Sequence, residues 1–123
     1  MTKIKTYKDL LVWQKAHNLV LSVYKITEEY PKHELFALTS QIRRAAISVS
    51  ANLVEGFRRQ SIKDSINFYN MSDASLEELK YHLLLSKDLN YININEYNTI
   101  MNKAEEVGKL LTKWLQSQRK FIT

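Results

Sequence analysis

The residues best suited to bind another molecule are a group of cations near the middle of the chain. Four of the five arginines lie within 17 residues, and residues 41–63 hold five cations against one carboxylate. Guanidinium and ammonium groups gathered in this way suit phosphate. A solvated helix face, or cations that complement the C-terminal dipole of a helix, would give the same pattern. The residues best placed to contact nucleic acid are Arg43, Arg58, Arg59 and Lys63.

A second group is a polar strip that runs along one helix between two apolar sides. At 100° per residue its members fall in line, and they are Gln41, Arg44, Ser48, Asn52 and Glu55. The two charged residues of the strip, Arg44 and Glu55, are eleven residues apart, about 16 Å along a helix, so they cannot pair with each other within it. The strip is therefore a hydrogen-bonded network between helices or subunits, a pore lining, or a contact line for nucleic acid. For a network, the first partners to expect are Ser75 and Glu78.

Catalytic and metal-binding patterns are weak in this sequence. The chain has no Cys, which excludes thiolate metal sites, and none of its three His follows a Glu at the spacing that di-iron bundles use. Glu78 and His82 are four residues apart and suit a hydrogen bond better than a metal. Two Gly cannot build a phosphate-cradling loop, and no nucleophile motif is present. We therefore expect a protein that is not an enzyme and that holds no cofactor or metal.

Four long helices are expected to position these residues. Two Gly and one Pro in 123 residues are too few for a chain with many turns or strands. Apolar spacing, Pro31 and the capping residues Ser61 and Asn93 predict helices over about 8–30, 33–57, 62–90 and 94–118. Gly56 lies where a left-handed helix end would be easy to form. Short connections make consecutive helices antiparallel, so residues 1–123 are predicted to form one all-α, up-down-up-down four-helix bundle.

The second predicted helix is apolar on two sides. One side continues the core spacing through Ile42, Val49 and Leu53, and the other carries Phe36, Ile47 and Val54. A helix of this kind contacts more than its own bundle, so a partner subunit is expected.

Composition bears on where the protein works. The formal net charge is a mild +5. The sequence has neither a signal-peptide pattern at its start nor an apolar window long enough to span a bilayer. We therefore expect a cytoplasmic protein with no membrane partner.

Three segments carry a family resemblance. They are LLVWQKA at 10–16, YPKHELFALTSQIRRAAISVSANLVEGFRRQS at 30–61 and DASLEELKYHLLLSKDLNYI at 73–92. In these segments the chain resembles the bacterial four-helix bundle proteins first associated with intervening sequences inside large-subunit ribosomal RNA genes. One departure is Ala74, where that family tends to have Gly.

The resemblance implies a ring of five identical subunits. It also implies a relation to the accessory variability proteins of diversity-generating retroelements, which look like pentameric basic barrels that bind nucleic acid and a reverse transcriptase. We therefore expect a non-enzymatic homo-oligomer that binds nucleic acid electrostatically, with RNA favoured over DNA, through a basic ring surface. The alternative is a scaffold or accessory subunit whose partner is another protein.

Overall fold

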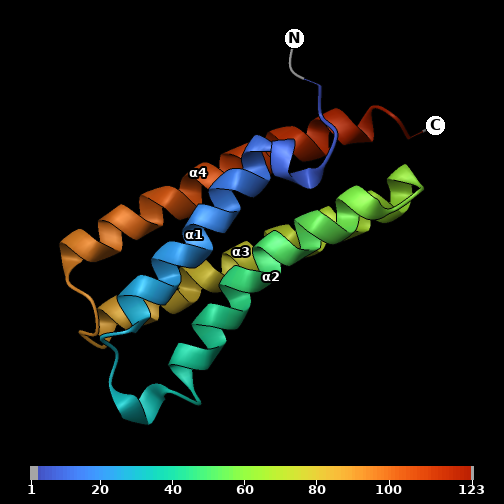
Figure 1. Cartoon of the computed structure of the whole chain (residues 1–123). Helices are drawn as coiled ribbons and strands as arrows, with labels where there is room; N and C mark the ends of the chain where they lie inside the picture. Colours follow the sequence, from blue (N-terminus) through green and yellow to red (C-terminus); the bar gives the residue numbers. More distant parts are fainter. Residues whose placement is uncertain (1–2, 123) are drawn as a thin grey trace.

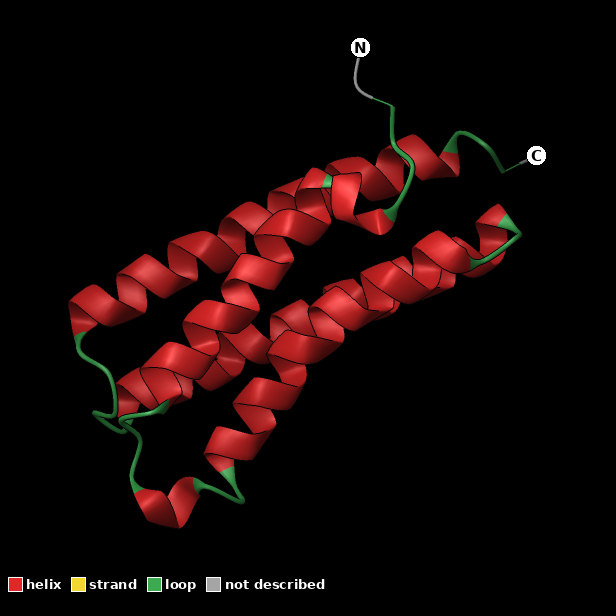
Figure 2. Ribbon diagram, in the orientation of Figure 1, coloured by secondary structure: helices red, strands yellow, loops and turns green. Residues whose placement is uncertain are grey.

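Four long helices make up most of this computed structural model, which describes residues 3–122. They are α1 (Leu11–Thr27), α2 (Leu38–Arg58), α3 (Ile62–Asp88) and α4 (Ile94–Arg119). No strand occurs among the described residues (Figure 2). Each helix packs against the next in the chain, and α4 returns beside α1, so both chain ends lie at one end of the bundle (Figure 1). The predicted all-α four-helix bundle is confirmed.

Side-chain caps start α3 and α4 at the predicted positions. The hydroxyl of Ser61 accepts the N–H of Asp64 at 3.1 Å. Asn93 and Glu96 form a reciprocal capping box, with N···O distances of 2.8 and 2.9 Å. These local contacts satisfy N–H groups that a helix start leaves without partners, which is why both starts were readable from the sequence.

The predicted helix over 8–30 is too long at both ends. Thr6 and Asp9 form a capping box, but it encloses a single 3₁₀ turn (Tyr7–Asp9). Leu10 is then extended (φ −79°, ψ 121°), and α1 begins only at the next residue. At the other end α1 stops at Thr27, four residues before Pro31, and two turns follow in which the Glu28 N–H donates to the Lys25 carbonyl and the Tyr30 N–H donates to the Thr27 carbonyl.

The predicted helix over 33–57 begins later than expected. Lys32–Glu34 form a separate 3₁₀ turn, and Ala37 leaves the helical region (φ −124°, ψ −106°). The carboxylate of Glu34 accepts the N–H of Leu38 at 3.3 Å, so the 3₁₀ turn supplies a partner for the first turn of α2. This side-chain acceptor competes with a continuous helix and sets the true start.

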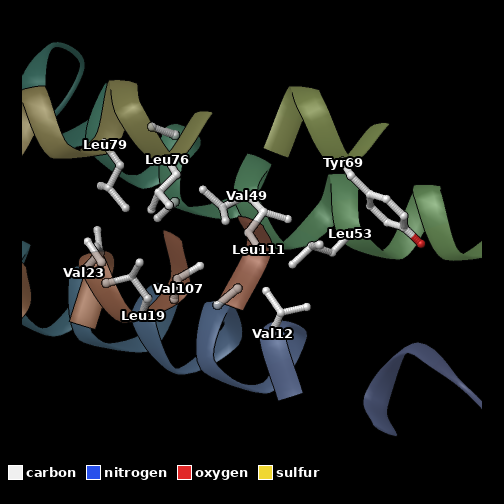
Figure 3. Close-up of a cluster of buried hydrophobic side chains, with 14 of the residues drawn as sticks. Val12, Leu19, Val23, Val49, Leu53, Tyr69, Leu76, Leu79, Val107 and Leu111 are labelled. Carbon is white, nitrogen blue, oxygen red and sulfur yellow. The ribbon is translucent and has the colours of Figure 1, made fainter. Parts of the chain in front are cut away.

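Aliphatic side chains from all four helices interlock along the bundle axis (Figure 3). The α2–α3 pair is close enough that the Ser72 hydroxyl donates to the carbonyl of Val49 at 2.7 Å. Small side chains permit this approach, and the hydrogen bond satisfies a polar group that is fully buried. The labelled core residues are Val12, Leu19, Val23, Val49, Leu53, Tyr69, Leu76, Leu79, Val107 and Leu111.

Gly56 does not provide the left-handed helix end expected for it. None of the described glycines has a positive φ, and α2 continues past this residue to Arg58. Its role is spatial, because a Cβ at Gly56 would lie 2.5 Å from Cε1 of Tyr69. The buried Tyr69 ring in turn meets Trp114 edge-on, with ring centroids 6.0 Å apart. This layer joins α2, α3 and α4 near the end where the chain termini lie.

The second apolar side predicted for this helix is exposed at Phe36 and Ile47, whereas Val54 is half-buried in the single chain. Phe36, just before α2, is 93% exposed, and Ile47 is 42% exposed. Leu21 and Tyr24 of α1 are also exposed hydrophobic residues. An exposed apolar surface of this kind is typical of a site that another protein covers.

None of the helices in the described part of the chain is long and apolar enough to cross a membrane.

A candidate nucleic-acid interface

Positive charge gathers at one end of the bundle. The residues at this end belong to 3–17, 51–69 and 113–122, which Figure 1 shows at the end where both termini and the α2–α3 connection lie. They hold ten cations and three carboxylates, a net charge of +7, whereas the rest of the chain has eight cations and ten carboxylates, or −2. The two parts give the +5 of the whole chain. We call this end the basic pole, and its cations are Lys3, Lys5, Lys8, Lys15, Arg58, Arg59, Lys63, Lys113, Arg119 and Lys120.

The fold brings these cations together because it has an even number of antiparallel helices. The start of α1 and the end of α4 then lie beside the α2–α3 turn. Arg119 of α4 reaches Asn70 of α3, with an Nη2···Oδ1 distance of 3.5 Å. Tyr7 packs edge-on against Trp13 and holds the N-terminal segment to α1, with centroids 5.0 Å apart. All ten side chains are exposed, as an electrostatic contact surface requires.

Two of the three carboxylates of the basic pole have local partners, and the third lies at a helix start. Asp9 accepts the backbone N–H groups of Thr6 and Lys5, at 2.9 and 2.8 Å, and these hydrogen bonds lower the pKa of Asp9. Glu55 pairs with Arg59, and Asp64 stands in the first turn of α3, where the helix dipole favours a negative charge. Lys15 of the basic pole also pairs with Glu106 of α4, at 3.7 Å. Among the described residues two of the ten cations, Lys15 and Arg59, therefore have an ion pair, and most of the others remain available to a ligand.

Two of the predicted phosphate contacts, Arg58 and Lys63, have no ion-pair partner within residues 3–122. Arg58 ends α2, and Lys63 lies in the first turn of α3, so a short connection separates them. Both are exposed. They are the members of the predicted group with the clearest access to an anion.

Arg43 does not join the basic pole. It lies 15 residues before Arg58 on the same helix, about 22 Å away along the axis. Its guanidinium carbon lies 4.6 Å from the centroid of the Tyr24 ring, and its Nε donates to the Thr27 hydroxyl at 2.9 Å. Arg43 therefore packs α2 against α1. This role could not be predicted from the residues next to it in the sequence.

The polar strip of α2 faces α3. The Ser48 and Ser75 hydroxyls are 2.7 Å apart, and the amide of Asn52 donates to the carbonyl and hydroxyl of Ser48 at 2.9 and 3.0 Å. A shallow hollow of about 270 Å³ lies beside this cluster, lined by Gln41, Arg44, Ala45, Ser48, Ser75 and Glu78. The Ser48–Ser75 hydrogen bond joins α2 to α3, as the network interpretation of the strip requires, whereas both Asn52 hydrogen bonds stay within α2.

Glu55 does not take part in the contacts between α2 and α3. Because Glu55 cannot pair with Arg44 within α2, the network interpretation required a partner for Glu55 on another helix or chain. The structure instead pairs Glu55 with Arg59 on the neighbouring turn, at 2.6 Å, and leaves its side chain 53% exposed. Glu78 likewise contacts His82 on its own helix, at 3.0 Å. An exposed ion pair four residues along contributes little to stability, so Glu55 does not anchor the bundle.

Seven cations of the basic pole were not among the predicted contacts. They belong to the two chain ends, to the start of α1 and to the last turns of α4. The predicted number of helices could have indicated them, because an up-down-up-down bundle brings its C-terminus back to the same end as its N-terminus. No group of three or more His, Asp or Glu among the described residues could hold a metal ion.

Comparison with known proteins places this fold in a family. A model of the family described as "23S rRNA-intervening sequence protein" matches residues 8–113. The chain belongs to this family. A similar solved structure is a protein of unknown function from the S23 ribosomal protein family of Bacteroides thetaiotaomicron. It is 29% identical, covers 85% of this chain and 98% of its own, and superposes with a TM-score of 0.77. None of the curated proteins matches the chain.

Proposed function

We propose that the protein is a non-enzymatic, cytoplasmic homo-oligomer that binds nucleic acid, RNA in preference to DNA, through its basic pole. The observation that carries this proposal is the segregation of charge, with +7 at one end and −2 in the rest of the chain. A uniform surface charge would serve solubility, whereas a segregated one attracts a polyanion to one place. The name of the family, which refers to an intervening sequence in 23S rRNA, favours RNA.

Assembly into a ring of five copies is the second part of the proposal. Its support is the exposed apolar residues at and before α2, since Phe36, just before the helix, is 93% exposed and Ile47 within it is 42% exposed. In a cyclic ring all copies are related by rotation about one axis, so their basic poles would lie on a common rim. Contacts that are weak individually then act together on one RNA chain. Light scattering at micromolar concentration should give about 72 kDa, five times the 14.5 kDa chain; a mass of one chain would overturn the assembly.

A salt titration of RNA binding tests the use of the basic pole. The variant Arg58→Ala/Lys63→Ala removes two unpaired cations from the pole. Its control, Lys25→Ala/Lys32→Ala, removes two exposed cations near the opposite end, so both proteins have the same net charge. For wild type, log affinity should fall with log salt by about 0.7–0.9 for each phosphate neutralised. The pole variant should reduce the steepness of this slope by up to about twice that amount, because it lacks two phosphate contacts, whereas the control should keep the wild-type slope.

Two results would contradict the proposal. An equal loss in both variants would mean that net charge alone, and not the basic pole, attracts the RNA. Wild-type affinity no tighter than about 10⁻⁴ M at low salt would leave no specific role for nucleic acid. In that case the protein-partner alternative, with the exposed apolar residues at and before α2 as its contact surface, would replace this one.

A further inference from the structure

Among the described residues, Arg59 is the cation of the basic pole that has both an ion pair and an aromatic ring beside it. Its Nη2 lies 2.6 Å from the carboxylate of Glu55, so its charge is already compensated. Its guanidinium carbon also lies 4.4 Å from the centroid of the Phe68 ring on α3. The adjacent Arg58 has no ion pair and no aromatic ring beneath it in the described part of the chain. Two neighbouring arginines of one segment therefore have different surroundings.

The backbone explains why only Arg59 is held in this way. Arg58 is the last residue of α2, whereas Arg59 has left the helix and is extended (φ −69°, ψ 148°). From this position its side chain reaches back to Glu55 and across to Phe68. The carboxylate contacts Nη2 and the guanidinium carbon lies over the Phe68 ring, while 41% of the Arg59 side chain stays exposed. The group is thus fixed before any ligand arrives, which lowers the entropy lost on binding.

The chemistry of such a group suits a base better than a phosphate. A guanidinium is planar and stacks on aromatic faces, and unpaired nucleobases stack on arginine planes. A phosphate approaching Arg59 would also meet the negative charge of Glu55, 2.6 Å away. Arg58 and Lys63, which are exposed and have no such partner, are better phosphate contacts. The Arg59 site and its neighbours therefore offer one stacking surface beside two phosphate contacts.

We infer that Arg59, supported by Phe68, is a stacking platform for an unpaired nucleobase, and that the ligand of the basic pole is single-stranded RNA. This inference rests on the proposed function and narrows its ligand. In a duplex the base faces are covered by their neighbours, so only a single strand can place a base on this platform.

The test compares Arg59→Lys with Arg58→Lys, because both changes keep the charge and remove the planar group. The probes are a fluorescently labelled single-stranded adenine RNA 12-mer and a duplex RNA of the same length. Arg59→Lys should weaken binding of the single strand about tenfold, which corresponds to about 1.4 kcal/mol. Arg58→Lys should change it less than twofold, and neither variant should change the salt slope or the affinity for the duplex.

A second measurement reports the stacking directly. A 12-mer carrying one 2-aminopurine should change its fluorescence when it binds wild type, and this change should be reduced in Arg59→Lys and in Phe68→Leu. Equal affinities of the two lysine variants for the single strand, or a duplex bound as tightly as the single strand, would overturn the platform but not the RNA-binding proposal. Wild type that binds neither RNA would overturn both.

Discussion

The close approach of Gly56 to Tyr69 predicts that Gly56→Ala destabilises the protein. The same substitution at Gly108, the control, is expected to stabilise it. In Gly56→Ala the new Cβ would lie 2.5 and 2.8 Å from two ring carbons of Tyr69 and 3.1 Å from the backbone oxygen of Ser65. The ring is only 2% exposed and is backed by Trp114, so it has little room to move. Overpacking of this kind costs up to about 3 kcal/mol, and the better helix propensity of Ala offsets about 1 kcal/mol. We expect a net loss of about 2 kcal/mol.

Gly108 is the matched control because it also lies within a helix. A Cβ there would meet Cδ2 of Leu76 at 3.4 Å and Nζ of Lys80 at 3.7 Å, which are ordinary contact distances. Gly108→Ala should therefore stabilise the protein by roughly 0.5–1 kcal/mol, the gain expected when Ala replaces a helical Gly without a clash. The same substitution is predicted to have opposite signs at the only two glycines of the chain.

Urea unfolding at one protein concentration, followed by circular dichroism, measures both variants. One concentration is essential because the stability of an oligomer depends on it. In a Tyr69→Leu background the cost of Gly56→Ala should shrink, because the ring that the Cβ would meet is gone. Stabilisation by Gly56→Ala in the wild-type background, or an unchanged cost beside Leu at position 69, would refute the steric explanation.

Two further predictions concern charged groups. The Tyr91 hydroxyl donates a hydrogen bond to the Glu34 carboxylate at 2.7 Å, which lowers the pKa of Glu34 below its ordinary 4.5. The stability that this hydrogen bond adds is therefore present above pH 4.5 and is lost as pH falls through the folded-state pKa of Glu34. The urea midpoint of Tyr91→Phe should therefore depend less on pH between 3 and 6 than that of wild type; parallel curves would contradict this. Glu55→Ala should change the free energy of unfolding by less than about 0.5 kcal/mol, because its ion pair is exposed. A loss of several kcal/mol would mean that another subunit buries Glu55.

The sequence by itself determined the helices and their arrangement. Apolar spacing, Pro31 and the caps at Ser61 and Asn93 act within a few residues, so they can be read without knowing the fold. Short connections then allow only antiparallel neighbours, which places both chain ends at one end of the bundle. The errors at the starts of α1 and α2 were also local. Before α1, the Thr6–Asp9 capping box encloses a 3₁₀ turn instead of an α-helix, and before α2, Glu34 of a 3₁₀ turn accepts the N–H of Leu38 at the helix start.

Only the tertiary structure decided what the individual side chains do. Gly56 leaves room for Tyr69, Arg43 packs on Tyr24, and Arg59 lies over Phe68 while Arg58 beside it does not. Each of these differences depends on whether an atom from another helix comes within a few ångströms. Residue type and helical period specify the direction of a side chain on its own helix, but the distance to a neighbouring helix is set by how all four helices pack together.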